Sequence, residues 1–204
     1  MRGPMSEQLS FFSADLAVPS VADLAGLLAA HGQVFTSGGV VRVSVVLDAR
    51  WRAEAIAQLV GEAGLTAQLR VLEPEDAEHG GHLVRTDSSP ELAALGRAWT
   101  KGAVKHLPHG WIPDGRALRA WALAAGRCDD AAYLFGLDPH APDTHQPAAA
   151  ALAAAGLTPV LLGVRGGGPA LRVGGRRRVR RLVEMLGSAP PAIPDDGYWP
   201  TPQR

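Results

Sequence analysis

Arginine supplies almost all of the positive charge of this chain, and its distribution is the first chemical clue. The only lysines are Lys101 and Lys105. A guanidinium group makes forked hydrogen bonds, so arginine suits phosphate groups and guanine edges better than lysine does. Apolar residues at helical spacing over 179–186 form a core stripe, so the neighbouring arginines face outward, either as a polyanion-binding patch or as a solvated helix face. These arginines are Arg176, Arg177, Arg178, Arg180 and Arg181.

Other residues that carry chemistry form no recognisable site. Cys128 is the only cysteine, so neither an intrachain disulfide nor a Cys/His zinc spacing is available. Gly166–Gly168 are not followed by the Gly-Lys-Ser/Thr of a phosphate-binding loop. His31 has no Cys or His partner nearby in the sequence, so we interpret it as a helix-end residue whose charged form is favourable there. The sequence predicts no metal and no cofactor.

Charge balance and hydropathy narrow the classes of function. The net charge is zero and the pI is about 7.1, whereas most dedicated DNA-binding domains are more basic. Residues 1–20 lack the pattern of a signal peptide, and the apolar runs are too short to span a bilayer. We therefore expect a cytoplasmic globular protein without a membrane partner. The neutral net charge keeps a protein partner open as an alternative.

The elements that must position any site form a first series over residues 21–99. Leucines at helical spacing end at Gly32, and β-branched runs flank the turn Ser37-Gly38-Gly39. A serine cap followed by Pro90 opens the last helix. The expected elements are a helix over 21–31, a hairpin of 34–35 and 40–47, a helix over 49–64, a hairpin of 67–72 and 82–86, and a helix opened by Ser88-Ser89-Pro90-Glu91.

A second series of elements follows residues 101–114, which show neither a helical nor a strand period. Residues 128–132 give no clear strand signal, so the first hairpin of this series is weaker than its counterpart. The expected elements are a helix over 116–125, a strand over 133–137, a helix over 146–155, a hairpin of 160–164 and 170–173, and a helix over 176–186. The proline-rich residues 188–204 should loop over the surface. A doubled order of helix, hairpin, helix, hairpin and helix constrains the fold strongly.

One short segment carries a family resemblance. Residues Leu24–Gly32 read Leu-Ala-Gly-Leu-Leu-Ala-Ala-His-Gly and match six of the nine letters of the LAGLIDADG motif of homing endonucleases. Leu118–Gly126 match three letters at the equivalent place, and Leu118–Pro139 also resemble the second such helix of WhiA-type transcription regulators. The resemblance implies an α+β fold with two pseudo-symmetric αββαββα halves that form a DNA-binding saddle. Its expected parts are a first half over 20–101, a linker over 102–114, a second half over 115–188 and a tail over 189–204.

The same resemblance implies that the usual catalytic acids are missing. In active homing endonucleases an acidic residue precedes the glycine that ends each motif helix, and the two acids together hold divalent metals. Here these positions are His31 and Ala125, neither of which is a carboxylate. Asp129 and Asp130 lie beyond the second glycine, and we interpret them as part of a solvated turn. Small residues on both helices should allow the helices to pack closely, and each terminal glycine should turn in a left-handed conformation.

The resemblance also suggests which residues contact a duplex. Polar residues on hairpin strands are candidate contacts, and Lys101 and Lys105 are candidate phosphate contacts. A non-cleaving, regulatory double-stranded DNA-binding protein is the principal hypothesis. The alternatives are an active endonuclease with displaced ligands and a degenerate domain that binds protein. The candidate strand residues are Arg42, Ser44, Gln68, Arg70, Arg85, Arg165 and Arg172.

Overall fold

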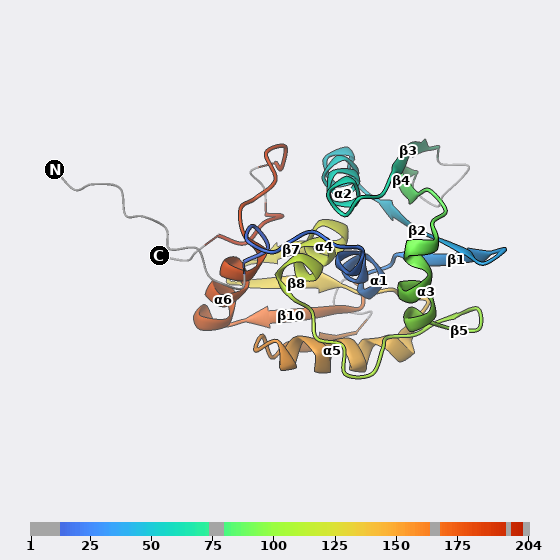
Figure 1. The fold of residues 1–204 in the computed structure, drawn as a ribbon. Helices are drawn as coiled ribbons and strands as arrows, with labels where there is room; N and C mark the ends of the chain where they lie inside the picture. The colour runs from blue at the N-terminus through green and yellow to red at the C-terminus, as the bar shows by residue number, and fades with distance from the viewer. Residues whose placement is uncertain (1–12, 74–79, 164–167, 195–196, 202–204) are drawn as a thin grey trace.

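The computed structural model describes residues 13–73, 80–163, 168–194 and 197–201, and Figure 1 shows their arrangement. The first series of elements comprises η1 (Val21–Leu24), α1 (Ala25–Ala29), β1 (Gln33–Ser37), β2 (Val40–Leu47), α2 (Arg50–Glu62), β3 (Ala67–Leu72), β4 (Gly81–Thr86), η2 (Pro90–Leu92) and α3 (Ala93–Trp99). The small hairpin of β5 (Thr100–Lys101) and β6 (Val104–Lys105) follows. The second series comprises α4 (Gly115–Ala125), β7 (Gly126–Asp129), β8 (Ala132–Gly136), η3 (Pro142–Thr144), α5 (His145–Ala154), β9 (Val160–Leu162), β10 (Ala170–Gly174) and α6 (Arg176–Leu186).

The two series build two antiparallel sheets of the same topology. Sheet A has the strand order β1-β2-β4-β3, and sheet C has the corresponding order β7-β8-β10-β9. In each sheet the second strand of the first hairpin pairs with the second strand of the next hairpin. This confirms the internal repeat and the α+β fold with two pseudo-symmetric halves.

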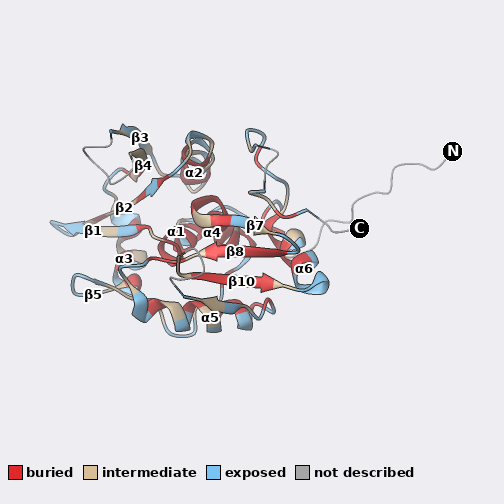
Figure 2. Cartoon of the chain, turned by 180° about the vertical axis from the view of Figure 1, so that it is seen from behind, coloured by how far each residue is buried: buried red, intermediate tan, exposed pale blue. Residues whose placement is uncertain are grey.

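Helices α1 and α4 pack against each other in the middle of the molecule, as the small residues on both helices predict (Figure 1). The approach is so close that a methyl group on Gly26 would overlap the backbone carbonyl of Ala117 and lie 2.8 Å from the amide nitrogen of Trp121. Both helices are buried almost throughout, and Figure 2 shows this buried zone continuing into β8. Trp121, Tyr133 and Phe135 are the largest fully buried side chains and contact one another in series.

The glycines that end the two helices have a different role from the one predicted. Neither Gly32 nor Gly126 has a positive φ, and Gly126 continues directly into β7 with φ −86°. Instead, both positions are too crowded for a side chain. A Cβ on Gly32 would lie 2.5 Å from the carbonyl oxygen of Leu27, and one on Gly126 would overlap the hydroxyl of Tyr133. Close packing, and not a left-handed turn, requires glycine at these helix ends.

Three short strands were missing from the sequence-based prediction. The segment Gly126–Asp129 forms the edge strand β7, although its polar residues give no alternating pattern. Thr100–Lys101 and Val104–Lys105 form a two-stranded hairpin across the start of the predicted linker. All three strands are ordered by pairing with a partner strand and not by their own side-chain pattern. The hairpin turn at Gly38 and Gly39 is as predicted, with positive φ at both glycines.

The described part of the proline-rich tail lies against the second half. The backbone amide of Cys128 donates to the carbonyl of Gly197 at 2.5 Å, and the Tyr133 hydroxyl donates to the carbonyl of Tyr198 at 3.0 Å. The tail thus runs beside the outer edge of β7. Among the described residues, no helix is both long and apolar enough to cross a membrane.

Candidate nucleic-acid interface

The open face of sheet A carries a row of polar side chains across all four strands. Directly opposite residues in antiparallel strands project to the same face. Gln33 on β1 pairs with Ser44 on β2, Ser44 pairs with Arg85 on β4, and Arg85 pairs with Gln68 on β3. Val41, Val43 and Val45 alternate with these residues and are buried on the other face. Sheet pairing therefore brings Ser44, Arg85 and Gln68 together, as the hairpin pattern suggested.

Contacts within this row hold two of its long side chains in place. Arg85 donates from Nη2 to the side-chain oxygen of Gln68 at 3.1 Å. Gln68 in turn donates from its amide nitrogen to Asp87 at 2.6 Å. Next to the row, the Arg42 guanidinium lies 4.2 Å from the centre of the Phe35 ring, its directly opposite neighbour. These interactions limit the number of orientations that the arginines adopt before any ligand arrives.

Arg70 lies two residues beyond Gln68 on β3 and therefore shares its face. It is opposite Leu83, which is opposite Val46 on β2. Val46 is 40% exposed, so an apolar strip lies beside the polar row. All five strand candidates of the first half thus lie on one face: Arg42, Ser44, Gln68, Arg70 and Arg85.

The corresponding face of sheet C is poorer in polar groups. Its central row consists of Arg127, Leu134, Arg172 and Val160, in the order of the strands. Arg172 donates from Nε to Asp129 at 2.8 Å, so part of its charge is already balanced. Arg165 lies outside the described residues. The sequence-based prediction omitted Arg127 because it did not identify β7 as a strand.

The two lysines lie on the small β5–β6 hairpin but in different surroundings. Lys101 is exposed. Lys105 is largely buried, and its ammonium donates to the carbonyl of Ala30 at 2.9 Å and to Asp138 at 3.0 Å. Burial lowers the pKa of Lys105, while the charge of Asp138 opposes that shift. Because its donors are used inside the protein, we leave Lys105 out of the interface proposed below.

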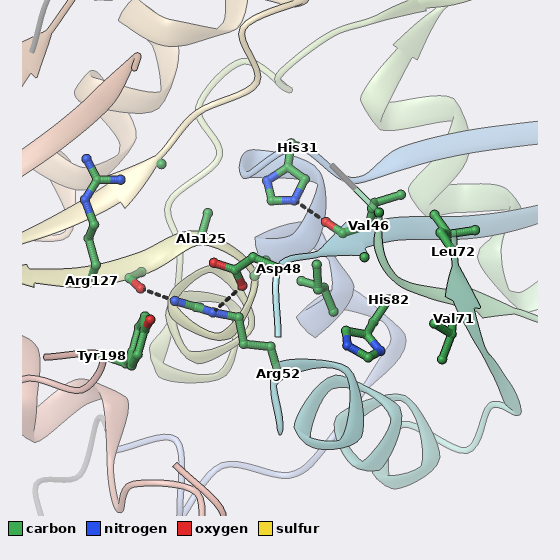
Figure 3. Close-up of a pocket in the computed structure, with 16 residues that line it drawn as sticks. His31, Val46, Asp48, Arg52, Val71, Leu72, His82, Ala125, Arg127 and Tyr198 are labelled. Atoms are coloured by element: carbon green, nitrogen blue, oxygen red, sulfur yellow. Dashed lines mark hydrogen bonds and ion pairs between the residues drawn. The ribbon is translucent and has the colours of Figure 1, made fainter. Parts of the chain in front are cut away.

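A cavity of about 700 Å³ lies at the carboxyl ends of the two central helices (Figure 3). His31 from the end of α1 and Ala125 from the end of α4 both line it, as the motif places them. Asp48, at the end of β2, lies between His31 and Arg52 in Figure 3. The remaining polar side chains of the wall come from His82, Arg127 and Tyr198.

The surroundings of His31 disfavour the charged form that was expected at a helix end. Burial is the main cause that lowers its pKa, and the charge of Lys105 lowers it further, while the bond to Val46 and the charges of Asp138 and Asp48 raise it. The ring nitrogen Nε2 lies 2.7 Å from the carbonyl oxygen of Val46, which can only accept, so Nε2 carries the proton. The imidazole is thereby oriented by β2.

Arg52 is a second residue of the cavity wall that the sequence-based prediction missed. Its guanidinium is buried and donates to the carbonyl oxygens of Ala122, Leu123 and Gly126 at 3.1, 2.8 and 2.6 Å. Its Nε lies 3.1 Å from the Asp48 carboxylate. It therefore caps the carboxyl end of α4, where the helix dipole favours a cation. The sequence could have indicated that Arg52 is buried, because position 52 lies one helical turn before Ile56 on the apolar stripe of the helix.

The cavity does not fit the hard divalent cation that the sequence resemblance implies. Mg²⁺ prefers oxygen ligands, whereas His31 supplies nitrogen and Ala125 supplies no side-chain donor. Asp129 is engaged with Arg172, and Asp130 occupies a turn with φ 48° at the far end of β7. Within the described ranges, no group of three or more His, Cys, Asp or Glu residues is arranged to hold a metal.

Comparisons with known proteins identify the fold. No protein-family model matches the sequence, and a search of curated proteins finds no match. Among solved structures, the homing endonuclease I-WcaI bound to its DNA recognition sequence superposes with a TM-score of 0.57 at 12% identity, covering 91% of this chain and 90% of that one. Full-length DUF199/WhiA from Thermatoga maritima gives 0.57 at 12% identity, with this chain spanning 82% of its own length and 55% of that protein. The N-terminal LAGLIDADG domain of DUF199/WhiA gives 0.54 at 12% identity, with coverage of 82% and 80%.

Proposed function

We propose that this chain, which has the LAGLIDADG homing-endonuclease fold, binds double-stranded DNA on the open faces of its two sheets without cutting it. The observation that carries the proposal is the polar row Gln33, Ser44, Arg85 and Gln68, flanked by Arg42 and Arg70 on the same face. I-WcaI, which shares the fold, was solved bound to its DNA recognition sequence.

The chemistry of this face suits the major groove. A two-stranded ribbon fits that groove, where guanidinium groups bind guanine and amide groups bind adenine in pairs of hydrogen bonds. Arg42 and Arg85 supply guanidinium groups, and Gln68 supplies an amide that would exchange its bonds to Asp87 and Arg85 for an adenine edge. The Gln33 amide donates to Asp138 inside the protein. Phe35 and Val46 are 51% and 40% exposed on this face and offer apolar contact to thymine methyl groups. Sheet C, with Arg127 and the partly neutralised Arg172, contributes fewer contacts.

The absence of cleavage follows from the helix ends. Hydrolysis at a metal site requires carboxylates that hold the ion against its hydration shell. The Nε2–H group of His31 is hydrogen-bonded to the carbonyl of Val46, and Ala125 has no side-chain atom that could bind a metal. The guanidinium of Arg52 places a positive charge at the end of α4. That charge opposes a divalent cation at the same place. A protein that occupies its DNA site without cutting can act as a transcription regulator, and we propose that role.

A salt-series binding measurement tests the proposal. Duplex DNA with a fluorescent label should bind the purified protein, with affinity that falls as salt rises from about 50 to 200 mM. If Arg42 and Arg85 bind phosphates, the variant R42Q/R85Q should flatten the log–log slope by about 0.9 for each arginine removed. If they bind base edges, each substitution should instead cost about 1–3 kcal/mol at the preferred base. Incubation with Mg²⁺ should leave the duplex intact.

The matched control is R50Q/R97Q, which removes two exposed arginines from α2 and α3. This control should bind like the unaltered protein. Equal binding by R42Q/R85Q and the unaltered protein would exclude sheet A as the DNA surface. No salt-dependent binding at all would favour the alternative, a domain of this fold that binds protein. Mg²⁺-dependent cutting would support an active endonuclease.

A further inference from the structure

Helix α6 carries an arginine cluster that the proposed interface does not use. Five of its first six residues are arginines, and all five are exposed, in a chain with zero net charge. Arg178 and Arg181 donate to the carbonyl oxygens of Thr158 and Ala155 at 2.9 and 3.1 Å. Arg180 pairs with Glu184 at 3.2 Å. Arg176 and Arg177 have no ion pair with any residue in the part of the chain that the structure describes.

This arrangement is unfavourable for the isolated helix. The amino end of a helix carries a partial positive charge, which disfavours cations in the first turn. Arg176 and Arg180, and likewise Arg177 and Arg181, stand four residues apart, a spacing at which like charges repel. The bonds of Arg178, Arg180 and Arg181 offset part of this cost, but no ion pair offsets it at Arg176 and Arg177 among the described residues, and such a partly uncompensated helix end is typical of a functional surface. A bound polyanion would relieve both costs.

The chemistry of the surface narrows the choice of polyanion. A groove of about 550 Å³ between α6 and the end of α5 is lined by four arginines of the cluster together with Gly156, Thr158 and Glu184. The apolar face of α6 is buried in the core through Val179, Leu182 and Leu186, so it is not available to enter a lipid surface. Guanidinium forks without an adjacent exposed apolar face match the phosphates of a nucleic-acid backbone.

The place of α6 separates it from the proposed interface. It packs against α4 and β10, on the side where α4 contacts β8, whereas Arg127 and Arg172 project from the opposite face of sheet C. Both views of the molecule show α6 at the end remote from β1 (Figures 1 and 2). We infer that the α6 arginine cluster binds the phosphate backbone of a second DNA duplex while the sheets hold the first. This inference rests on the proposed function for the first duplex.

A bridging assay with the full-length chain tests the second surface. One duplex with biotin is immobilised, protein is added, and retention of a second, fluorescent duplex is measured across a salt series. The unaltered protein should retain the second duplex, and R176Q/R177Q should reduce retention about tenfold and flatten its log–log salt slope by about 1.8, the value for two phosphate contacts. The control R50Q/R97Q should retain it fully. Thermal unfolding should show that both variants remain folded.

Three further measurements, of sedimentation, of lipid-vesicle binding and of single-duplex binding, distinguish the possible explanations. Sedimentation should give one protein per two duplexes, whereas two proteins per two duplexes would overturn the inference, since self-association would then explain the bridging. Bridging by R176Q/R177Q at the unaltered level, or binding of the protein to anionic lipid vesicles through these arginines, would also overturn it. If R176Q/R177Q no longer bound a single duplex while R42Q/R85Q bound it normally, the proposed function would be refuted, because α6 would then be the primary DNA surface.

Discussion

At the scale of single residues, each central helix ends on a positive charge supplied from elsewhere in the chain. Lys105 donates to Ala30 at the end of α1, and Arg52 donates to three carbonyls at the end of α4. Unpaired carbonyls at a buried helix end are costly, and cations are the natural partners there. With no acid at position 31 or 125, these cations meet no competing carboxylate from either motif helix.

Removing the Arg52 guanidinium should destabilise the fold. The substitution Arg52→Met keeps much of the side-chain volume but leaves the carbonyls of Ala122, Leu123 and Gly126 without these donors. We expect a decrease on the order of 3 kcal/mol in the free energy of unfolding, measured by urea denaturation. Arg50→Gln on the same helix, where the side chain is 81% exposed, is the matched control and should change stability by less than about 0.5 kcal/mol. Equal stability of the two variants would contradict the capping role.

Carboxylates at the two helix ends should create metal affinity. In the double variant H31D/A125D, two acids would line the same cavity, and hard oxygen ligands are what Mg²⁺ requires. Calorimetry should detect Mg²⁺ binding in this variant and none in the unaltered protein. The isosteric H31N/A125N keeps the side-chain shape without the charge and should bind far more weakly. Comparable heats in all three proteins would show that the helix ends do not control metal binding.

At the scale of elements, the packing of α1 on α4 depends on the lack of a side chain at Gly26. A methyl group there would overlap the Ala117 carbonyl, and backbone atoms of both helices would have to move apart. Gly26→Ala should therefore cost about 1–3 kcal/mol or more despite the better helix propensity of alanine.

A second glycine provides the control for this prediction. Gly61 lies in α2 with open space around the position of a Cβ, so Gly61→Ala should stabilise the protein by about 0.5–1 kcal/mol. Opposite signs in thermal unfolding are the expected result. A stabilising Gly26→Ala would mean that the two helices do not pack this closely.

The sequence predicted the elements whose own pattern specifies them. The leucines of 24–28, the valines of β2 and the Gly38–Gly39 turn are each decided by residues within a few positions. Strand β7 was not predicted because its order comes from pairing with β8, which no pattern within Gly126–Asp129 reveals. The cap by Arg52 was missed for the same reason, since its partners are 70 to 74 positions away. The open-face placement of Arg42, Ser44 and Arg85 was predictable because alternation along a strand fixes it.

At the scale of the whole molecule, Asp138 joins the two halves. Its carboxylate in the second half accepts hydrogen bonds from Lys105 at 3.0 Å and from Gln33 of β1 at 2.8 Å. Burial raises the pKa of Asp138, but the charge and hydrogen bonds of Lys105, with those of His140 and Gln33, outweigh this effect and lower it overall. The charged carboxylate is thus the form that the folded protein favours.

Neutralising this carboxylate should destabilise the contact between the two halves and so lower the free energy of unfolding. In Asp138→Asn the buried ammonium of Lys105 loses its counter-charge, which typically costs about 3–5 kcal/mol. A carboxyl whose folded pKa is depressed adds stability above its ordinary pKa, here 3.8, and this stability is lost as the pH falls through the lower, folded value. The gap between the unaltered protein and Asp138→Asn should therefore be full at neutral pH and close below about pH 4. The exposed Asp143→Asn serves as control, and a gap independent of pH would contradict the argument.

The tail that lies beside β7 should also limit self-association of the protein through this edge strand. A strand at the margin of a sheet offers free amides and carbonyls to the same strand of another molecule, which is a common start of aggregation. Here Gly197 satisfies the amide of Cys128, and Tyr198 covers Arg52 with its ring 4.9 Å from the guanidinium. A chain shortened before residue 197 would present an unpaired margin beside a newly uncovered cation. Such a product should be lost to inclusion bodies on expression, although the ten strands that the structure describes and the entire proposed DNA surface remain encoded in it.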